Sequence, residues 1–419
     1  MIGSELPKGW KLVRLKEITS IIRGVSYPKE EAKLHPEENY VHILRGGNIQ
    51  DGKIVFETDD NVYVNSSLVG EEQFVLKDDV VIVASTGSKK VIGKAATIEE
   101  DSRCISFGAF LLLLRTNVID KRFHSYFFQT QYYRNTISSL AGGININNIK
   151  KEHIENLQIP LPPLTEQKQI AEKLDKLFDQ IETIKEASNK IPELLKNFRQ
   201  QVLTYAVTGK LTNSDFAHWE KSTIGAIGKV KGGKRLPKGE ELVNYNTGYP
   251  YIRARDLKEG TVLKQNIMYL LPETQEKIKN YIVKTNDVYI TIVGAKIGDA
   301  GIIPESMNNA NLTENAAKIT DLSEKIMPQY LSLWLQAPLC QSEIQQSIKS
   351  AAQGKLALTR INSLSVCFPP IESQKEIIDK VEYLLGELKI IESKFYQLQN
   401  ILEKLPQALL CKAFKGELL

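Results

Sequence analysis

The chain has 419 residues, 42% of them hydrophobic and 25% charged, and its formal net charge is only +4. This length suffices for two ordinary domains, and the balanced charge argues against a stand-alone DNA-binding protein, which usually carries a strongly basic face. With no signal peptide, no apolar run near the roughly 20 residues of a membrane span, and four cysteines that form no Cys-x-x-Cys pair, we expect a soluble, cytoplasmic protein without a zinc site or disulfide framework.

Residues 1–160 contain short β-branched runs separated by Gly, Asn and Asp, a pattern typical of strands and turns. The run 79–84 is one such predicted strand, and residues 125–139 predict a helix. The block holds 20 basic and 20 acidic side chains, so it is electrically neutral. We predict a mixed α and β domain of ordinary size over these residues.

Residues 161–212 predict a long helix. Pro162–Pro163 cannot lie inside it, Thr165 is a plausible N-cap, and Gly209 suits a left-handed C-terminal cap. Pro192 predicts a kink or a break. In between, apolar side chains recur every three or four residues over about five heptads, which indicates a coiled coil. The predicted seam comprises Leu174, Leu177, Ile181, Ile184, Ile191 and Leu195.

The second half of the chain repeats the first. Residues 213–367 are weakly similar to the first block, and residues 328–349 predict a helix. Residues 368–419 then repeat the helical segment with a constant shift of 207, including its Pro-Pro pair and final glycine, and Pro406 predicts a second kink or break. The second predicted seam comprises Val381, Leu384, Leu388, Ile391, Leu398 and Leu402.

Chain geometry predicts how these segments pack. A compact domain tends to have neighbouring termini, so the second helix should begin beside the end of the first and run antiparallel to it. We predict an α+β protein with pseudo-two-fold symmetry, in which two similar mixed domains are separated by an intramolecular antiparallel coiled coil. The alternative, a two-helix core element of one globule, fits the narrow seam and broad polar face less well.

The sequence contains no recognisable catalytic motif. The five histidines form no metal-binding or protease motif, and no Gly-x-Ser-x-Gly is present. The stretch 87–95 resembles a phosphate loop, but five residues separate its glycines and Ala95 stands where a hydroxyl is needed. A strand–turn–strand with an exposed basic tip is the favoured interpretation. We expect no catalytic residue, no metal and no cofactor.

The tag Pro-Pro-x-x-x-Gln-Lys at 162–168 and 369–375, each followed by a heptad helix and a Gly-x-Leu ending, resembles the specificity subunit of type I restriction–modification enzymes. The resemblance covers essentially the whole chain. In the second tag, Glu372-Ser373 stands where the first has Thr165-Glu166. The resemblance implies target-recognition domains at 1–160 and 213–367, and conserved spacer helices at 161–212 and 368–419.

The resemblance also implies a function. Each domain would read one half of a bipartite, asymmetric target in double-stranded DNA, and the coiled coil would set the gap between the halves. Two modification subunits would carry the S-adenosylmethionine-dependent methylation of adenine, and restriction subunits would join them in the full complex. This chain would be a non-catalytic subunit of that methyltransferase and endonuclease complex.

Candidate DNA-binding residues are those whose side chains can hydrogen-bond to bases or phosphates from predicted loops. Solvated surface side chains and, for the asparagines, simple turn formation are the alternatives. The candidates in the first block are Arg45, Ser85, Thr86, Ser88, Lys89, Lys90, Asn145, Asn147 and Asn148. Those in the second block are Lys231, Lys234, Arg235, Arg253, Arg255, Thr291, Lys296, Lys355, Thr359 and Arg360.

Two other functions remain open at the level of sequence. A coiled-coil scaffold that binds only protein partners would show the same repeat, and substituting Arg253 or Lys89 would then leave DNA binding unchanged. An enzyme with an unrecognised site, such as a solitary nuclease, would show a metal-dependent activity from the purified chain alone.

Overall fold

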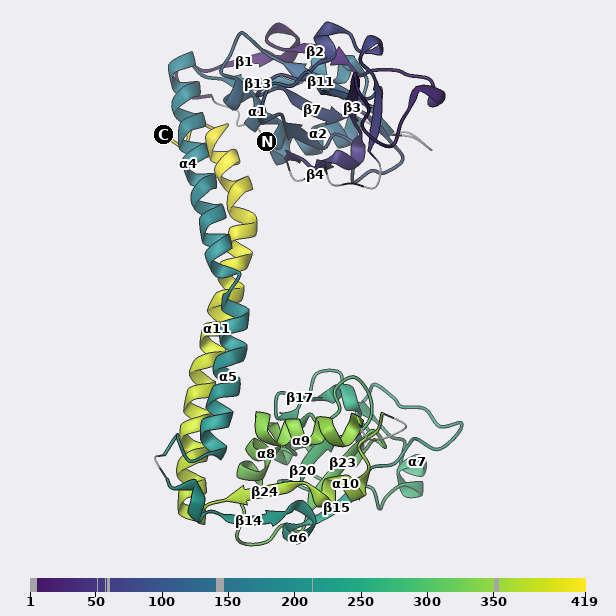
Figure 1. Cartoon of the computed structure of the whole chain (residues 1–419), viewed down its shortest axis with the longest axis vertical. Coiled ribbons are helices and arrows are strands. Elements are labelled where there is room, and N and C mark those ends of the chain that lie inside the picture. Colours follow the sequence, from purple (N-terminus) through teal and green to yellow (C-terminus); the bar gives the residue numbers. More distant parts are fainter. Residues whose placement is uncertain are drawn as a thin grey trace. The chain divides into compact units, whose positions relative to one another are not determined.

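The computed structural model describes residues 6–50, 52–56, 58, 61–140, 147–212, 214–349 and 354–419 (Figure 1). It divides into two compact units, Met1–Ser188 with Gln397–Leu419 (unit 1) and Asn189–Tyr396 (unit 2). Each unit contains one mixed α and β domain together with segments of long helices.

The domain of unit 1 is built on a four-stranded antiparallel sheet. Its two middle strands carry continuous apolar runs, Val-Val-Ile-Val and Leu-Leu-Leu-Leu, and all eight of these side chains are buried. Such runs are typical of strands that are covered on both faces. In order across the sheet, the strands are β2 (Ser20–Arg23), β11 (Leu111–Arg115), β7 (Val80–Val83) and β9 (Ala95–Thr97).

A second sheet, short strand pairs and α-helices complete the described part of this domain. The sheet has the order β10 (Ile105–Phe107), β3 (Tyr40–Leu44), β6 (Val62–Asn65). Three short strand pairs are β1 (Lys11–Arg14) with β13 (Gln158–Leu161), β4 (Ile49–Gln50) with β5 (Lys53–Ile54), and β8 (Ser85–Thr86) with β12 (Asn147–Asn148). The helices are α1 (Lys121–Gln129), α2 (Gln131–Leu140) and α3 (Lys151–Glu155).

The domain of unit 2 repeats this topology. Its main sheet has the order β15 (Lys229–Gly232), β23 (Ala316–Thr320), β20 (Val288–Thr291), β21 (Ala300–Ile302). The smaller sheets contain β19 (Met268–Tyr269), β16 (Pro250–Ile252) and β22 (Asn311–Leu312), β14 (Glu220–Thr223) with β24 (Ser365–Phe368), and β17 (Leu257–Lys258) with β18 (Thr261–Val262). The helices are α6 (Ile224–Ile227), α7 (Pro272–Lys277), α8 (Pro328–Gln336), α9 (Pro338–Lys349) and α10 (Leu358–Ser363).

The continuous helices predicted at 125–139 and 328–349 are wrong, because the structure has two consecutive helices in each region. The breaks fall at Thr130 and Ala337, which are 207 residues apart and have extended backbones. Ala337 precedes a proline, and a residue in that position avoids the helical region. Thr130 caps the next helix, since its hydroxyl accepts a hydrogen bond from the backbone N–H of Tyr133 (3.1 Å).

The long helices are α4 (Leu164–Ser188), α5 (Ile191–Val207) and α11 (Ile371–Ala413). The predicted break at Pro192 is confirmed, because that proline lies in the first turn of α5, whereas Pro406 lies inside α11. Gly209 and Gly416 have the positive φ expected of C-terminal caps. The predicted N-cap at Thr165 is wrong, since α4 already begins one residue earlier.

Within each unit the helical segments run antiparallel, as predicted (Figure 1). In unit 1, Lys173 near the start of α4 donates to the carbonyl of Leu418 beyond the end of α11 (2.6 Å). In unit 2, Arg199 of α5 forms an ion pair with Glu392 (3.4 Å), and Lys380 donates to a carbonyl just past the end of α5 (3.4 Å). The predicted fold class, two similar mixed domains with antiparallel coiled-coil helices, is confirmed in these respects.

Ten of the twelve predicted seam residues are buried or half-buried. The two exceptions are Ile184 and Ile391, which are 44% and 51% exposed. Their assignment to the seam was wrong. The two residues are 207 positions apart, so the same position leaves the seam in both copies of the helix.

The glutamine in each Pro-Pro tag ties a long helix to its domain. Gln167 accepts a hydrogen bond from the backbone N–H of Asp120 (2.9 Å) and donates to the first proline carbonyl of its own tag (2.8 Å). Gln374 accepts from the backbone N–H of Met327 (2.8 Å), and it donates to the Lys325 carbonyl (2.7 Å) and to its own tag (2.8 Å). Both side chains are almost fully buried. The tag therefore has a structural role.

The two domains differ at a buried position, which is a histidine in unit 1 and a leucine in unit 2. His124 is fully buried on α1, and its Nε2 shares a hydrogen bond with Thr19 Oγ1 (2.9 Å). Its Nδ1 has no partner within the described part of the chain. Burial lowers the pKa of His124 from 6.5 to about 3. The equivalent residue in unit 2 is Leu331, which is also fully buried.

We expect His124 to make unit 1 sensitive to acid. Because its pKa is lower in the folded state, the unfolded chain binds the proton first, and stability falls as the pH drops from 6.5 towards 3. At pH 5 the loss is about 2 kcal/mol relative to pH 7.5. We expect His124→Leu to remove most of this difference, measured by chemical denaturation at both pH values. An equal loss in the variant would contradict the assignment.

Candidate nucleic-acid interface

In unit 1 the structure joins two groups of candidate residues that are distant in sequence. Strand β8 pairs with β12 in antiparallel register, so that Thr86 lies opposite Asn147 and Ser85 opposite Asn148. The next residue after β12 continues the ladder, donating its N–H to the Ala84 carbonyl (2.7 Å). Of Asn147 only the backbone is described, and the candidate Asn145 lies outside the described residues. The result is a short polar ribbon at the end of the buried strand β7.

A basic turn follows this ribbon. Residues 87–93 (the first turn) lie between β8 and β9, and Lys89 and Lys90 are exposed. The turn is closed by its own backbone, because the carbonyl of Ser88 accepts from two N–H groups farther along (both 3.1 Å). The Ser88 N–H is 3.3 Å from the hydroxyl of Thr86. A strand follows the turn, as predicted, whereas a phosphate loop would open a helix.

Unit 2 builds a comparable arrangement at the end of β20. Residues 293–298 (the second turn) loop out from this strand and return to it, and the Gly298 N–H donates to the Thr291 carbonyl (2.9 Å). The N–H of Leu356 donates to the Ile292 carbonyl (3.0 Å), which brings its neighbour Lys355 beside the turn. The candidates Lys296, Lys355, Thr359 and Arg360 are exposed, whereas Thr291 is buried.

The candidates Arg45 and Arg253 occupy the same place, the turn after β3 or β16. In both domains the backbone N–H of this arginine donates to a side-chain oxygen three residues later, Asn48 (2.8 Å) or Asp256 (2.9 Å). The Arg253 guanidinium also binds both carboxylate oxygens of Asp256 (2.8 Å each), and its side chain is only 15% exposed. It is therefore engaged within the domain, while Arg255 is exposed.

The last three candidates, Lys231, Lys234 and Arg235, are exposed at β15 and just beyond it. Arg235 pairs with Glu314 (2.8 Å), and Lys231 is 4.0 Å from Asp321. Lys234 Nζ lies 5.4 Å from the centre of the Tyr281 ring, in a cation–π contact. A cavity of about 380 Å³ lies here, and its lining includes Lys231, Asn280 and Tyr281. Asn280 and Tyr281 are not among the candidates predicted from the sequence, because neither follows a Gly-rich turn; only the fold brings them beside Lys231.

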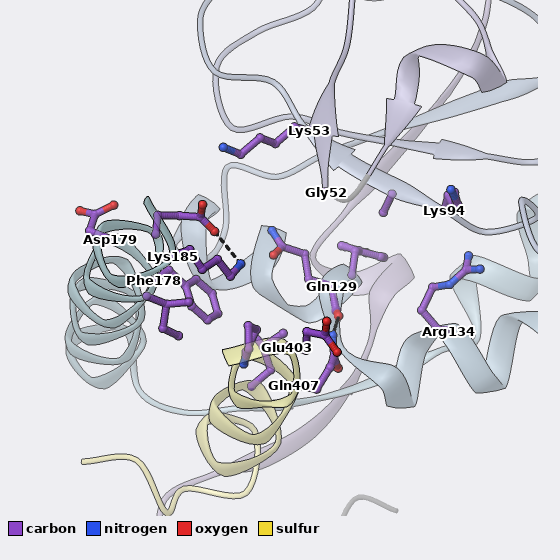
Figure 2. A pocket seen from close by; sticks show the side chains of 16 residues that line it. Gly52, Lys53, Lys94, Gln129, Arg134, Phe178, Asp179, Lys185, Glu403 and Gln407 are labelled. Atoms are coloured by element: carbon purple, nitrogen blue, oxygen red, sulfur yellow. Dashed lines mark hydrogen bonds and ion pairs between the residues drawn. The ribbon is translucent and has the colours of Figure 1, made fainter. Parts of the chain in front are cut away.

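A larger cavity of about 620 Å³ lies in unit 1 between the domain and its helices (Figure 2). The domain contributes basic side chains, Lys53, Lys94 and Arg134. The helices contribute Asp179, Glu182, Lys185 and Glu403, and Lys185 forms an ion pair with Glu182 (2.8 Å). None of the predicted DNA-binding residues lines this cavity.

Within the described ranges, no cluster of three or more His, Cys, Asp or Glu side chains could hold a metal ion. In the same part of the chain, no helix is long and apolar enough to span a membrane. The arrangement in each unit offers exposed hydrogen-bonding side chains on turns that follow the strands of a sheet, the kind of surface that can read base edges.

Comparison with known proteins identifies close relatives. The family described as "Type I restriction modification DNA specificity domain" matches residues 7–193 and 217–400, so it matches twice. The EcoKI specificity subunit of Escherichia coli strain K12 is 34% identical over all of this chain and 91% of its own length. The StySPI specificity subunit of Salmonella potsdam is 35% identical with the same coverage.

Solved structures share the fold at much lower sequence identity. A chain from a structural study of assembly and conformational transition in the type I R-M system superimposes with a TM-score of 0.72 at 17% identity, covering 99% of this chain and 100% of that one. The HsdS subunit of Thermoanaerobacter tengcongensis gives 0.68 at 18% identity, covering 99% and 98%.

Proposed function

Because this chain belongs to the family of type I restriction–modification specificity subunits, we propose that it reads a bipartite, asymmetric DNA target and positions catalytic partner subunits on it. Residues 1–160 and 213–367 are the two target-recognition domains. The helical segments 161–212 and 368–419 set the gap between the half-sites. The chain itself is non-catalytic.

One observation supports this proposal most directly. In each unit an exposed turn with at least one lysine follows a buried middle strand of the main sheet, after β7 and the short β8 in one domain and after β20 in the other. The side chains on the two turns differ: Ser88, Lys89 and Lys90 in the first, against Lys296 in the second. Two similar scaffolds that present unlike side chains would read two unlike half-sites, and the target is therefore asymmetric.

The proposed protein partners are two modification subunits, joined by restriction subunits in the full complex. Exposed apolar residues occupy equivalent positions in the two helix copies. Leu194 and Ile401 are 63% and 57% exposed, and Ile184 and Ile391 are similarly exposed. Apolar side chains exposed in pairs, 207 residues apart, suit two identical partners. These partners would also supply phosphate contacts, since the first domain has no net charge.

The test is to map methylated adenines in genomic DNA from cells that express this chain with its modification subunits. We expect a split motif with two different halves and a gap of fixed length. Methylation that is the same without this chain would contradict the proposal and favour a scaffold that binds only proteins. A single continuous motif would contradict the assignment of one half-site to each domain.

A further inference from the structure

The first turn is held against the domain by one side chain of α2. Arg134 donates through Nη1 to the carbonyl of Ile92 (2.6 Å) and through Nη2 to the carbonyl of Lys90 (3.2 Å). Figure 2 shows Arg134 reaching from its helix towards Lys94, the residue that follows the turn. Where the turn ends, Gly93 has φ +68°, and an added Cβ would lie only 2.5 Å from Ile137 Cγ2. The turn is therefore fixed against α2 by hydrogen bonds and by close packing.

The second turn is held in the same way by a different residue. Gln341 of α9 donates through Nε2 to the carbonyl of Gly298 (2.9 Å), where that turn ends. Gly298 has φ +97°, and an added Cβ would lie 2.9 Å from Gln341 Oε1 and 3.2 Å from Ile344 Cγ2. Gln341 and Ile344 are 207 residues after Arg134 and the isoleucine on α2 that packs on the first turn. The two domains therefore build the same contact from equivalent positions.

What the two contacts share is a hydrogen-bond donor, not a charge. Arginine is cationic and glutamine is neutral, yet both reach a backbone carbonyl in the last residues of the turn. Neither side chain lies on the exposed tip of its turn: Arg134 lines the cavity of about 620 Å³, and Gln341 is half-buried. A role in holding the turn therefore fits both residues better than direct contact with DNA.

We propose that Arg134 and Gln341 are positioning residues that fix the two turns for base discrimination, each acting on one half-site. This inference rests on the proposed DNA-reading function. A donor must be held within about 0.5 Å of its productive position to discriminate between base edges. Contacts of long lysine side chains with phosphates tolerate larger displacements. Releasing a turn therefore reduces discrimination more than it reduces affinity for DNA.

The experiment uses the full chain assembled with its modification subunits. Arg134→Ala, Arg134→Gln and Gln341→Ala are compared with Ser138→Ala and Gln345→Ala, exposed positions on the same two helices that serve as controls. The probes are duplexes carrying the motif mapped from genomic methylation, intact or with one base pair altered in either half. The readout is the ratio of methylation rates on intact and altered duplexes, with unfolding temperatures measured in parallel.

Arg134→Ala is expected to reduce discrimination about tenfold in one half of the motif, and Gln341→Ala to do so in the other half. Arg134→Gln should restore most of the discrimination, because glutamine performs this role in unit 2. The inference is overturned if discrimination is unchanged in both alanine variants, or if each variant reduces discrimination equally in both halves of the motif. Should Arg134→Ala fail to assemble, Arg134→Gln and Gln341→Ala decide the outcome. A wild-type complex without any sequence preference would instead refute the proposed function itself.

Discussion

A chain in which residues 213–367 are replaced by a second copy of residues 1–160 is expected to direct methylation to a split palindrome. The helical segments that flank the two domains are related by a constant shift of 207, so the junctions stay in register. Within each unit these segments run antiparallel. Two identical domains would read the same half-site, and the pseudo-two-fold repeat of the sequence predicts that the two copies of this half-site form an inverted repeat.

The measurement is adenine-methylation mapping of genomic DNA from cells that carry the altered chain and the modification subunits. One half of the natural motif should persist and appear twice, and the other half should vanish completely. The reciprocal chain, with two copies of residues 213–367, is the matched control and should yield a palindrome of the other half. A motif unchanged in either chain would show that the replaced block does not read DNA.

Gln374→Leu is expected to destabilise unit 2 by about 3 kcal/mol or more. The substitution removes the partner of the buried Pro369 carbonyl and of two part-buried groups, the Met327 N–H and the Lys325 carbonyl, and each buried group left unpaired costs about 1–3 kcal/mol. Hydrogen exchange of α8 should accelerate, since the N–H of Met327 loses its acceptor at the start of that helix. Gln167→Leu should have the corresponding but smaller effect on α1, because Gln167 makes two such bonds.

Hydrogen exchange resolved by peptide separates the two units in one experiment. Gln374→Leu should leave the exchange of α1 unchanged, and Gln167→Leu should leave that of α8 unchanged. Gln169→Leu, at an exposed position on α4, is the control and should change neither helix. If Gln374→Leu and Gln169→Leu behave alike, the buried hydrogen bonds of the tag contribute little to stability.

The repeat and the helices could be predicted from the sequence because both depend on local patterns. Heptad spacing, Pro192 and the two final glycines describe α4, α5 and α11 well. The predictions are wrong where tertiary contacts determine the end of a helix or the burial of a side chain. The hydroxyl of Thr130 caps α2 and splits a predicted helix, and nothing local distinguishes Ile184 from the buried members of the seam.

The candidate site was only partly predictable, for a related reason. The sequence indicates polar loops at 85–90 and at 145–148, but the pairing of β8 with β12 joins residues about 60 positions apart. The role of Arg134 gave no signal by itself, because its counterpart Gln341 is a different residue type. A comparison of the two copies at the constant shift of 207 pairs Arg134 with Gln341.

The pairing of β1 with β13, and of β14 with β24, brings the entry and the exit of each domain together. A domain whose first and last strands are paired can be exchanged as a unit, because the chain enters and leaves it at neighbouring positions. A genetic crossover within the repeated helical segments would then combine one existing domain with a domain from another gene, and both domains would still fold. Novel targets can therefore arise by recombination in one step, without a gradual redesign of either reading surface.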